Sequence, residues 1–172
     1  VDLYVHSKSG KWEWSGADYS FGDTVEYHFR GIRPDFTREY FLYLPLYNKV
    51  QWLEIGVPKH AKIVPLPVRT AKPVVVYGTS IAQGGCASRP GMAWTAILGR
   101  MLNMPVINLG FSSNGLLAKP VLDLMAEIDA RLYVLDCLPN LYTFPESEVE
   151  ERITAAVKLL QEKRPGVPIL LV

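Results

Sequence analysis

Three apolar runs in this chain end in polar turns, and each turn carries a residue type that has a use in catalysis. These residues are Ser80, Gly110 and Asn140, and the runs before them are residues 74–77, 106–109 and 132–135. A serine hydroxyl becomes a nucleophile when a neighbouring base accepts its proton. Backbone and carboxamide N–H groups can stabilise the oxyanion that forms when a nucleophile attacks a carbonyl group. The three turns together predict acyl-transfer chemistry if the fold brings them to one place.

Each of these residues also has an ordinary structural interpretation. Ser80 can belong to a simple polar turn, Gly110 can serve a loop that needs a positive backbone angle, and Asn140 can form an Asx turn. The nearby Asp136 is interpreted as a structural residue that satisfies loop donors. Cys137 lacks an adjacent histidine, so a packed thiol is the favoured interpretation.

The pattern after residue 72 alternates between strands and helices. Such alternation predicts parallel strands joined by right-handed crossovers, and ligands bind beyond the carboxyl ends of strands in these sheets. A fourth apolar run occupies residues 169–172, and Ser147 with Glu150 suggests a capping box at the start of the last helix. Helices are predicted over residues 92–102, 119–128 and 147–164.

The part before residue 68 is rich in aromatic and β-branched residues that alternate with period two. Many short strands separated by turns predict a β-sandwich or jelly-roll-like domain over residues 1–68, followed by an α/β domain over residues 69–172. Trp12, Trp14 and Trp52 lie in the first part. Core packing is the favoured role for them, and stacking on sugars is the alternative.

The totals exclude several classes of function. A formal net charge of +1 argues against electrostatic binding to nucleic acid or to a membrane surface, and no apolar run is long enough to span a bilayer. We expect no metal and no cofactor, because neither a ligand spacing nor a phosphate-cradling loop is present. Cys86 and Cys137 are too few for a disulfide framework, but a single disulfide between them stays open. We expect a secreted or periplasmic protein, although the chain has no visible targeting segment.

The three turns resemble the sequence blocks of the SGNH (GDSL-like) hydrolases. Gly78-Thr79-Ser80 is similar to the first block, Gly-Asp-Ser, with threonine in the middle, and Gly110 matches the glycine of the second. Of the third block, Gly-x-Asn-Asp, only Asn140 is kept. The runs 136–140 and 84–91 resemble a bacterial subgroup in which a β-rich domain precedes the hydrolase.

The resemblance implies a three-layer, flavodoxin-like α/β/α fold and a serine esterase. It implies that Ser80 is the nucleophile, and that the amides of Ser80 and Gly110 and the side chain of Asn140 hold the oxyanion. The family's Asp-x-x-His block, which supplies the base, is expected beyond Val172, because the chain's histidines are His6, His28 and His60.

We therefore expect an ester hydrolase whose substrates are small-molecule or carbohydrate esters, with small acyl groups on carbohydrates preferred. Residues 1–172 alone are expected to be nearly inactive. The alternative from a different class is a glycan-binding protein whose hydrolase-like half is inactive. A nucleotide-binding flavodoxin-like domain is a third option that no loop favours.

Overall fold

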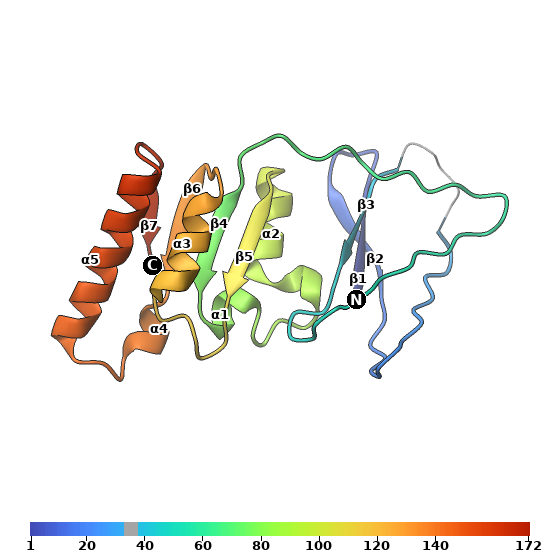
Figure 1. The fold of residues 1–172 in the computed structure, drawn as a ribbon. Helices are drawn as coiled ribbons and strands as arrows, with labels where there is room; N and C mark the ends of the chain where they lie inside the picture. The colour runs from blue at the N-terminus through green and yellow to red at the C-terminus, as the bar shows by residue number, and fades with distance from the viewer. Residues whose placement is uncertain (33–37) are drawn as a thin grey trace. The chain divides into compact units, whose positions relative to one another are not determined.

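The computed structural model describes residues 1–32 and 38–172, and these form two compact units. The first, here called the β unit, comprises Val1–Arg69 together with Ser88–Gly91. The second, the α/β unit, comprises Thr70–Ala87 and Met92–Val172. In Figure 1 the ribbon is coloured by residue number, so that each unit can be followed along the chain. Among the described residues, no helix is long and apolar enough to cross a membrane.

The β unit contains one antiparallel sheet with the strand order β2-β1-β3. Its strands are β1 (Asp2–His6), β2 (Trp12–Ala17) and β3 (Tyr40–Tyr43). The central strand β1 buries Asp2, Leu3 and Tyr4. On β2, the ring of Trp12 stacks on Phe41 of β3 with 4.0 Å between the ring centroids.

The β-rich character of the first part is confirmed, but the expected second layer of strands is absent from its described residues. The segments 25–29, 50–55 and 62–64 alternate like strands and yet contain no strand in the structure. Apolar side chains of the last two segments face solvent, as Ile55 at 55% and Val64 at 78% exposure illustrate, whereas the apolar residues of 25–29 are half-buried. Alternation indicates an extended backbone, but a strand also needs a partner for its N–H and C=O groups.

Two of the three tryptophans differ from the predicted core packing. Trp14 is 54% exposed and Trp52 is 60% exposed, whereas Trp12 is half-buried. Alternation places Trp14 on one face of β2, and that face has no second sheet over it in the described β unit. The prediction of core packing is therefore wrong for Trp14 and Trp52.

The α/β unit is built on a parallel sheet, as predicted, and its strand order is β5-β4-β6-β7. The central strand β4 is buried along its whole length, which is typical of a strand covered on both faces. The strands are β4 (Val74–Gly78), β5 (Val106–Gly110), β6 (Leu132–Asp136) and β7 (Ile169–Leu171). The helices are α1 (Ser80–Gln83), the short 3-10 helix η1 (Pro90–Met92), α2 (Trp94–Leu102), α3 (Lys119–Glu127), α4 (Leu138–Leu141) and α5 (Glu146–Lys163).

Two cores lie on opposite faces of this sheet, because successive side chains of a strand point to opposite sides. The larger core joins Tyr77 and Tyr133 to α3 and α5, and it includes Met125 and Leu160 without exposure. The smaller core packs Val76 against residues of α1 and α2. Figure 1 shows α3 and α5 near β6 and β7.

The helix predictions hold, with shifts of one or two residues at helix ends. Pro120 occupies the first turn of α3, as expected for a residue without an N–H group. The predicted capping box is wrong, because α5 begins at Glu146 after Pro145, and no side chain caps it. The fixed backbone angle of Pro145 starts the helix earlier than the serine would, so Ser147 lies inside the first turn.

Candidate active site

Ser80 is the first residue of α1, directly after the central strand β4 and its turn. The turn is rigid: Thr79 is completely buried, and its hydroxyl oxygen accepts a hydrogen bond from the Ile81 backbone N–H at 3.2 Å. Gly78 is required there, since a Cβ at this position would lie 2.6 Å from the Cβ of Ala82. The half-buried Ser80 is thus delivered at the carboxyl edge of the sheet, where ligands of such folds bind.

The strand register brings the ends of three strands together. Gly78 pairs with Gly110 of β5 on one side and with Asp136 of β6 on the other. The turn after β4 therefore lies between the loop after β5 and the loop after β6. This is the juxtaposition on which the sequence-based interpretation depended.

Gly110 has a packing role that differs from the predicted one. A Cβ on Gly110 would lie 2.1 Å from the backbone nitrogen of Gln83, so only glycine lets α1 approach β5 so closely. Its own N–H donates to Oδ1 of Asn108 at 2.8 Å. That amide is engaged in this structure, and the role of Gly110 as an oxyanion donor stays a prediction.

The remaining amides of the loop after β5 are nearly all engaged as well. Phe111 donates to the Gly78 carbonyl oxygen at 2.9 Å, and Ser112 donates to Oε1 of Gln83 at 2.8 Å. Asn114 donates to the Phe111 carbonyl oxygen at 3.0 Å. The amide of Ser113, a residue with a positive φ of 59°, has no acceptor among the described residues.

Asn140 lies in α4 and is tied to the loop after β5 by its side chain. The carboxamide oxygen is assigned to face the backbone N–H groups of Asn114 and Gly115, from which it accepts at 3.3 and 3.0 Å. This orientation directs the NH₂ group away from those two donors. Gly115 in turn approaches the turn after β4, because a Cβ on it would lie 2.5 Å from the Gly78 carbonyl oxygen. The three loops that carry Ser80, Ser113 and Asn140 are therefore in mutual contact.

Two other groups at the strand ends have altered acidity. Burial raises the pKa of the Asp136 carboxyl at the end of β6. Burial also raises the pKa of the Cys137 thiol to about 12, which leaves it protonated and a poor nucleophile. Cys137 is buried and Cys86 is exposed, and both are free thiols, so the disulfide left open from the sequence is not formed.

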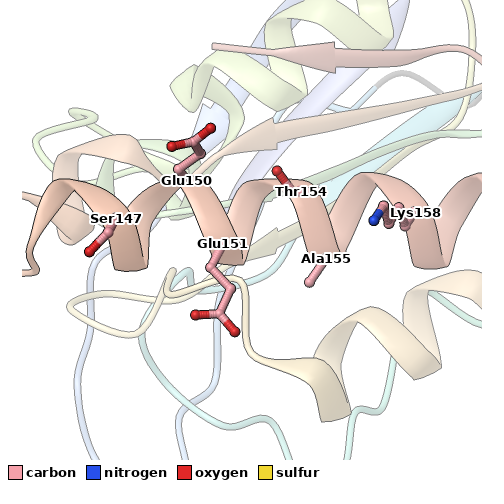
Figure 2. Close-up of a pocket in the computed structure, with 6 residues that line it drawn as sticks. All are labelled: Ser147, Glu150, Glu151, Thr154, Ala155 and Lys158. Carbon is pink, nitrogen blue, oxygen red and sulfur yellow. The ribbon is translucent and has the colours of Figure 1, made fainter.

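Other features of the chain do not contribute to this cluster. All three histidines belong to the β unit, where Nε2 of His28 lies 3.5 Å from Oε1 of Glu26 and both side chains are exposed. Figure 2 shows the side chains that line a pocket along α5. All six residues that line it come from that helix, and none comes from a strand-end loop.

The structure places Ser80 and Asn140 at neighbouring strand ends, as predicted, and it adds Asn108 and Ser113, which the sequence does not single out. Asn108 lies in the predicted apolar run 106–109, yet its Nδ2 donates to the Ala82 carbonyl oxygen at 2.8 Å and to Oγ1 of Thr95 at 2.9 Å. A polar residue inside an otherwise apolar run was the available signal. Nothing local in the sequence points to Ser113.

The fold and the cluster together define a parallel α/β domain with a serine at the strand–helix turn that ends its central strand. A family model of the GDSL-like lipase/acylhydrolase family matches residues 71–172, and a second model, described as the N-terminus of Esterase_SGNH_hydro-type, matches residues 1–63. The chain belongs to the GDSL-like lipase/acylhydrolase family. No match was found among curated proteins.

Solved structures agree with this assignment. The chain is similar to a protein from Bacteroides ovatus ATCC 8483 assigned as a GDSL-like lipase, with a TM-score of 0.85 and 40% identity. The match covers 99% of this chain and 49% of that one, so this chain spans about half of its length.

Two more distant structures share the fold alone. The salicylyl-acyltransferase SsfX3 has a TM-score of 0.53 and 22% identity over 60% of this chain and 32% of its own. The SGNH-hydrolase family esterase AlinE4 has a TM-score of 0.51 and 18% identity over 61% of this chain and 60% of its own.

Proposed function

We propose that the protein is a serine ester hydrolase that works through an acyl-enzyme. The observation that carries this proposal is the contact among three strand-end loops. They gather the Ser80 turn, the Ser113 amide, for which the described part of the chain offers no acceptor, and the carboxamide of Asn140. Membership of the GDSL-like lipase/acylhydrolase family supports the same reaction class.

In the proposed mechanism, Oγ of Ser80 attacks the carbonyl carbon of an ester while a base takes its proton. The carbonyl oxygen gains negative charge, and N–H groups that are held in place before the reaction stabilise it. We assign these donors to the Ser80 amide, the Ser113 amide and the Asn140 NH₂ group, with Ser113 in place of the predicted Gly110. Collapse of the intermediate expels the alcohol, which receives the proton, and water then hydrolyses the acyl-serine to a carboxylic acid.

The base in this proposal is an imidazole. Residues 70–172 contain no histidine, so the proposal assigns the base to a histidine outside residues 1–172. In a serine hydrolase this group accepts the hydroxyl proton and later donates it to the leaving alcohol.

For the substrate, we propose small acyl esters of carbohydrates. The support is the β-rich unit that accompanies the hydrolase fold, because it presents exposed aromatic side chains such as Trp52. The substrate needs its own test, because the reaction class does not specify it. The test compares kcat/KM for acetylated sugars with kcat/KM for simple aryl acetates.

The experiment for the reaction class is hydrolysis of p-nitrophenyl acetate by the full-length protein. The Ser80→Ala variant is expected to lose at least about a hundredfold in kcat/KM, since removal of a serine nucleophile is among the most costly changes in such enzymes. Ser147→Ala, an exposed serine of α5, is the matched control and keeps wild-type activity. Equal activity of Ser80→Ala and wild type would refute the proposal.

The exposure of Trp52 also favours a second candidate, glycan binding by the β unit without catalysis. This candidate predicts that polysaccharide binding falls in Trp52→Ala and is unchanged in Ser80→Ala, with no hydrolysis by either. Trp14 is the weaker candidate for stacking on a sugar, because an arginine guanidinium already lies over its ring.

A further inference from the structure

The carboxylate of Asp2 is completely buried in the β unit, and both of its oxygens have partners. Nε1 of Trp14 donates to Oδ1 at 2.8 Å, and the backbone N–H of Gly91 donates to Oδ2 at 3.0 Å. Nε of Arg89 lies 3.2 Å from the same Oδ2. Because a buried carboxylate is stable only where donors and opposite charge replace its hydration, these partners hold one another in a defined arrangement.

Arg89 and Gly91 belong to a four-residue segment, Ser88–Gly91, here called the anchored segment. Nη2 of Arg89 donates to the Tyr4 hydroxyl at 3.4 Å, and its guanidinium lies 5.0 Å from the centroid of the Trp14 ring. A Cβ on Gly91 would lie 2.3 Å from Cε2 of Tyr4, so the segment is packed directly on β1. By its contacts the anchored segment belongs to the β unit, while the residues on both sides of it belong to the α/β unit.

The chain between Ser80 and the anchored segment is short and internally bonded. The N–H groups of Gly84 and Gly85 donate to the Ser80 carbonyl oxygen at 3.1 and 2.6 Å, and Ala87 donates to the Gly84 carbonyl oxygen at 3.1 Å. The helix that begins with Ser80 is a single turn of four residues. A single turn does not hold its own conformation, because one hydrogen bond does not offset the entropy of fixing its dihedrals. Its geometry therefore depends on its neighbours: on Asn108 of β5, which donates to the Ala82 carbonyl oxygen, and on the connection that follows the helix and binds the Ser80 carbonyl oxygen.

We propose that Asp2 is a positioning residue for the nucleophile. By fixing Ser88–Gly91, the Asp2 carboxylate holds one end of a connection whose other end fixes the Ser80 carbonyl. When the anchor is lost, the connection gains freedom, and the Ser80 hydroxyl is held less often in the attacking geometry, where small displacements are costly. The inference rests on the proposed function of Ser80, and it assigns a role in that reaction to the β unit.

The kinetic test uses the full-length protein with Asp2→Asn, which keeps the shape and removes the charge. Arg89→Gln is the second variant; Arg89 is partly exposed, so this change leaves the buried carboxylate with two donors. At temperatures well below each melting point, both variants are expected to lose about tenfold in kcat with KM changed less than about twofold, the pattern for a loss confined to the transition state. Glu13→Gln, an exposed carboxylate of β2, is the matched control and keeps the wild-type kcat.

Hydrogen exchange gives a readout that does not depend on activity. The amides of Gly84 and Gly85, whose acceptor is the Ser80 carbonyl, are expected to exchange faster in both variants than in Glu13→Gln. Unchanged exchange at these amides in a folded variant overturns the inference. Faster exchange at these amides with an unchanged kcat also overturns it. The same holds if the loss in kcat is no larger than the loss of folded protein in the sample. If Ser80→Ala keeps wild-type hydrolysis, the proposed function fails, and the positioning role fails with it even where exchange shows the anchor.

Discussion

The side-chain oxygen of Asn140 accepts a hydrogen bond from the backbone N–H of Gly115 at 3.0 Å. This bond joins α4 to the loop after β5, two segments that are far apart in the chain. The oxygen and the NH₂ group of the carboxamide therefore have different roles. The oxygen stabilises the contact between loops, and the NH₂ group is directed away from it and can donate to a substrate.

Replacing Asn140 by aspartate tests the role of the NH₂ donor separately from that of the oxygen acceptor. Asn140→Asp keeps an acceptor for Gly115 and removes the NH₂ donor, so kcat/KM is expected to fall by about 10²–10³-fold, as for loss of an oxyanion donor. Asn140→Ala is expected to lose as much activity and also about 1–2 kcal/mol of unfolding free energy, because the Gly115 N–H loses its acceptor, whereas the Asn114 N–H keeps the Phe111 carbonyl oxygen. Kinetics with urea unfolding of both variants checks this. Full activity in Asn140→Asp would exclude the carboxamide as a donor.

Gly110→Ala tests the packing role of that glycine. Its Cβ would meet the backbone nitrogen of Gln83 at 2.1 Å, and backbone atoms cannot move aside cheaply. We expect a loss of about 1–3 kcal/mol in unfolding free energy, the range for overpacking, with a fall in activity because α1 carries Ser80. Gly56→Ala, which has open space around its Cβ, is the control. A stable and active Gly110→Ala would contradict the close approach.

The two thiols should differ sharply in reactivity. Cys86 is exposed, whereas burial raises the pKa of Cys137 to about 12. At pH 8, only about 10⁻⁴ of such a thiol is thiolate, the form that reacts. Iodoacetamide is expected to modify Cys86 in the native protein and Cys137 only after unfolding, as measured by peptide mass spectrometry. Modification of both thiols at similar native rates would refute the burial argument.

Asp136 predicts a pH-dependent contribution to stability. Burial raises the pKa of its carboxyl in the folded state, so the native protein binds this proton more tightly than the unfolded chain does. The free energy of unfolding therefore falls as the pH rises through the folded-state pKa of this carboxyl. Below the unfolded-state pKa the carboxyl is protonated in both states and causes no such loss.

Asp136→Asn cannot ionise, so it is expected to melt higher than wild type at pH 7. The difference should disappear near about pH 3, where both states of the wild-type carboxyl are protonated. Calorimetry at both pH values checks this, with exposed Asp23→Asn as control. A lower melting temperature at pH 7 would mean that the ionised carboxylate is stabilised by a partner.

Residues 1–172 by themselves are expected to be very poor esterases. Their histidines, His6, His28 and His60, all lie in the β unit, and the proposed base is a histidine outside these residues. We expect p-nitrophenyl acetate hydrolysis by residues 1–172 to be no faster than by their Ser80→Ala variant. Fast hydrolysis that Ser80→Ala abolishes would show that another group in these residues acts as the base.

The parallel sheet and its helices were predictable from the sequence. An apolar run such as Val74–Tyr77 between polar turns has few conformations other than a strand covered on both faces. The edge at which Ser80 and Asn140 lie followed from parallel pairing alone, because parallel strands present the same ends to the same side. By contrast, residues 50–55 alternate as strands do, but no strand within 1–32 or 38–172 pairs with them.

Local sequence determined which residue types lie at the strand ends, because the spacing of apolar residues along a strand or helix depends only on neighbouring residues. Tertiary structure alone decided what their polar atoms bind. The Gly110 amide donates to Asn108, and the Asp2 carboxylate accepts from Gly91 far along the chain. A hydrogen bond depends on distances of a few tenths of an ångström between segments, and those distances arise only when the whole core has packed.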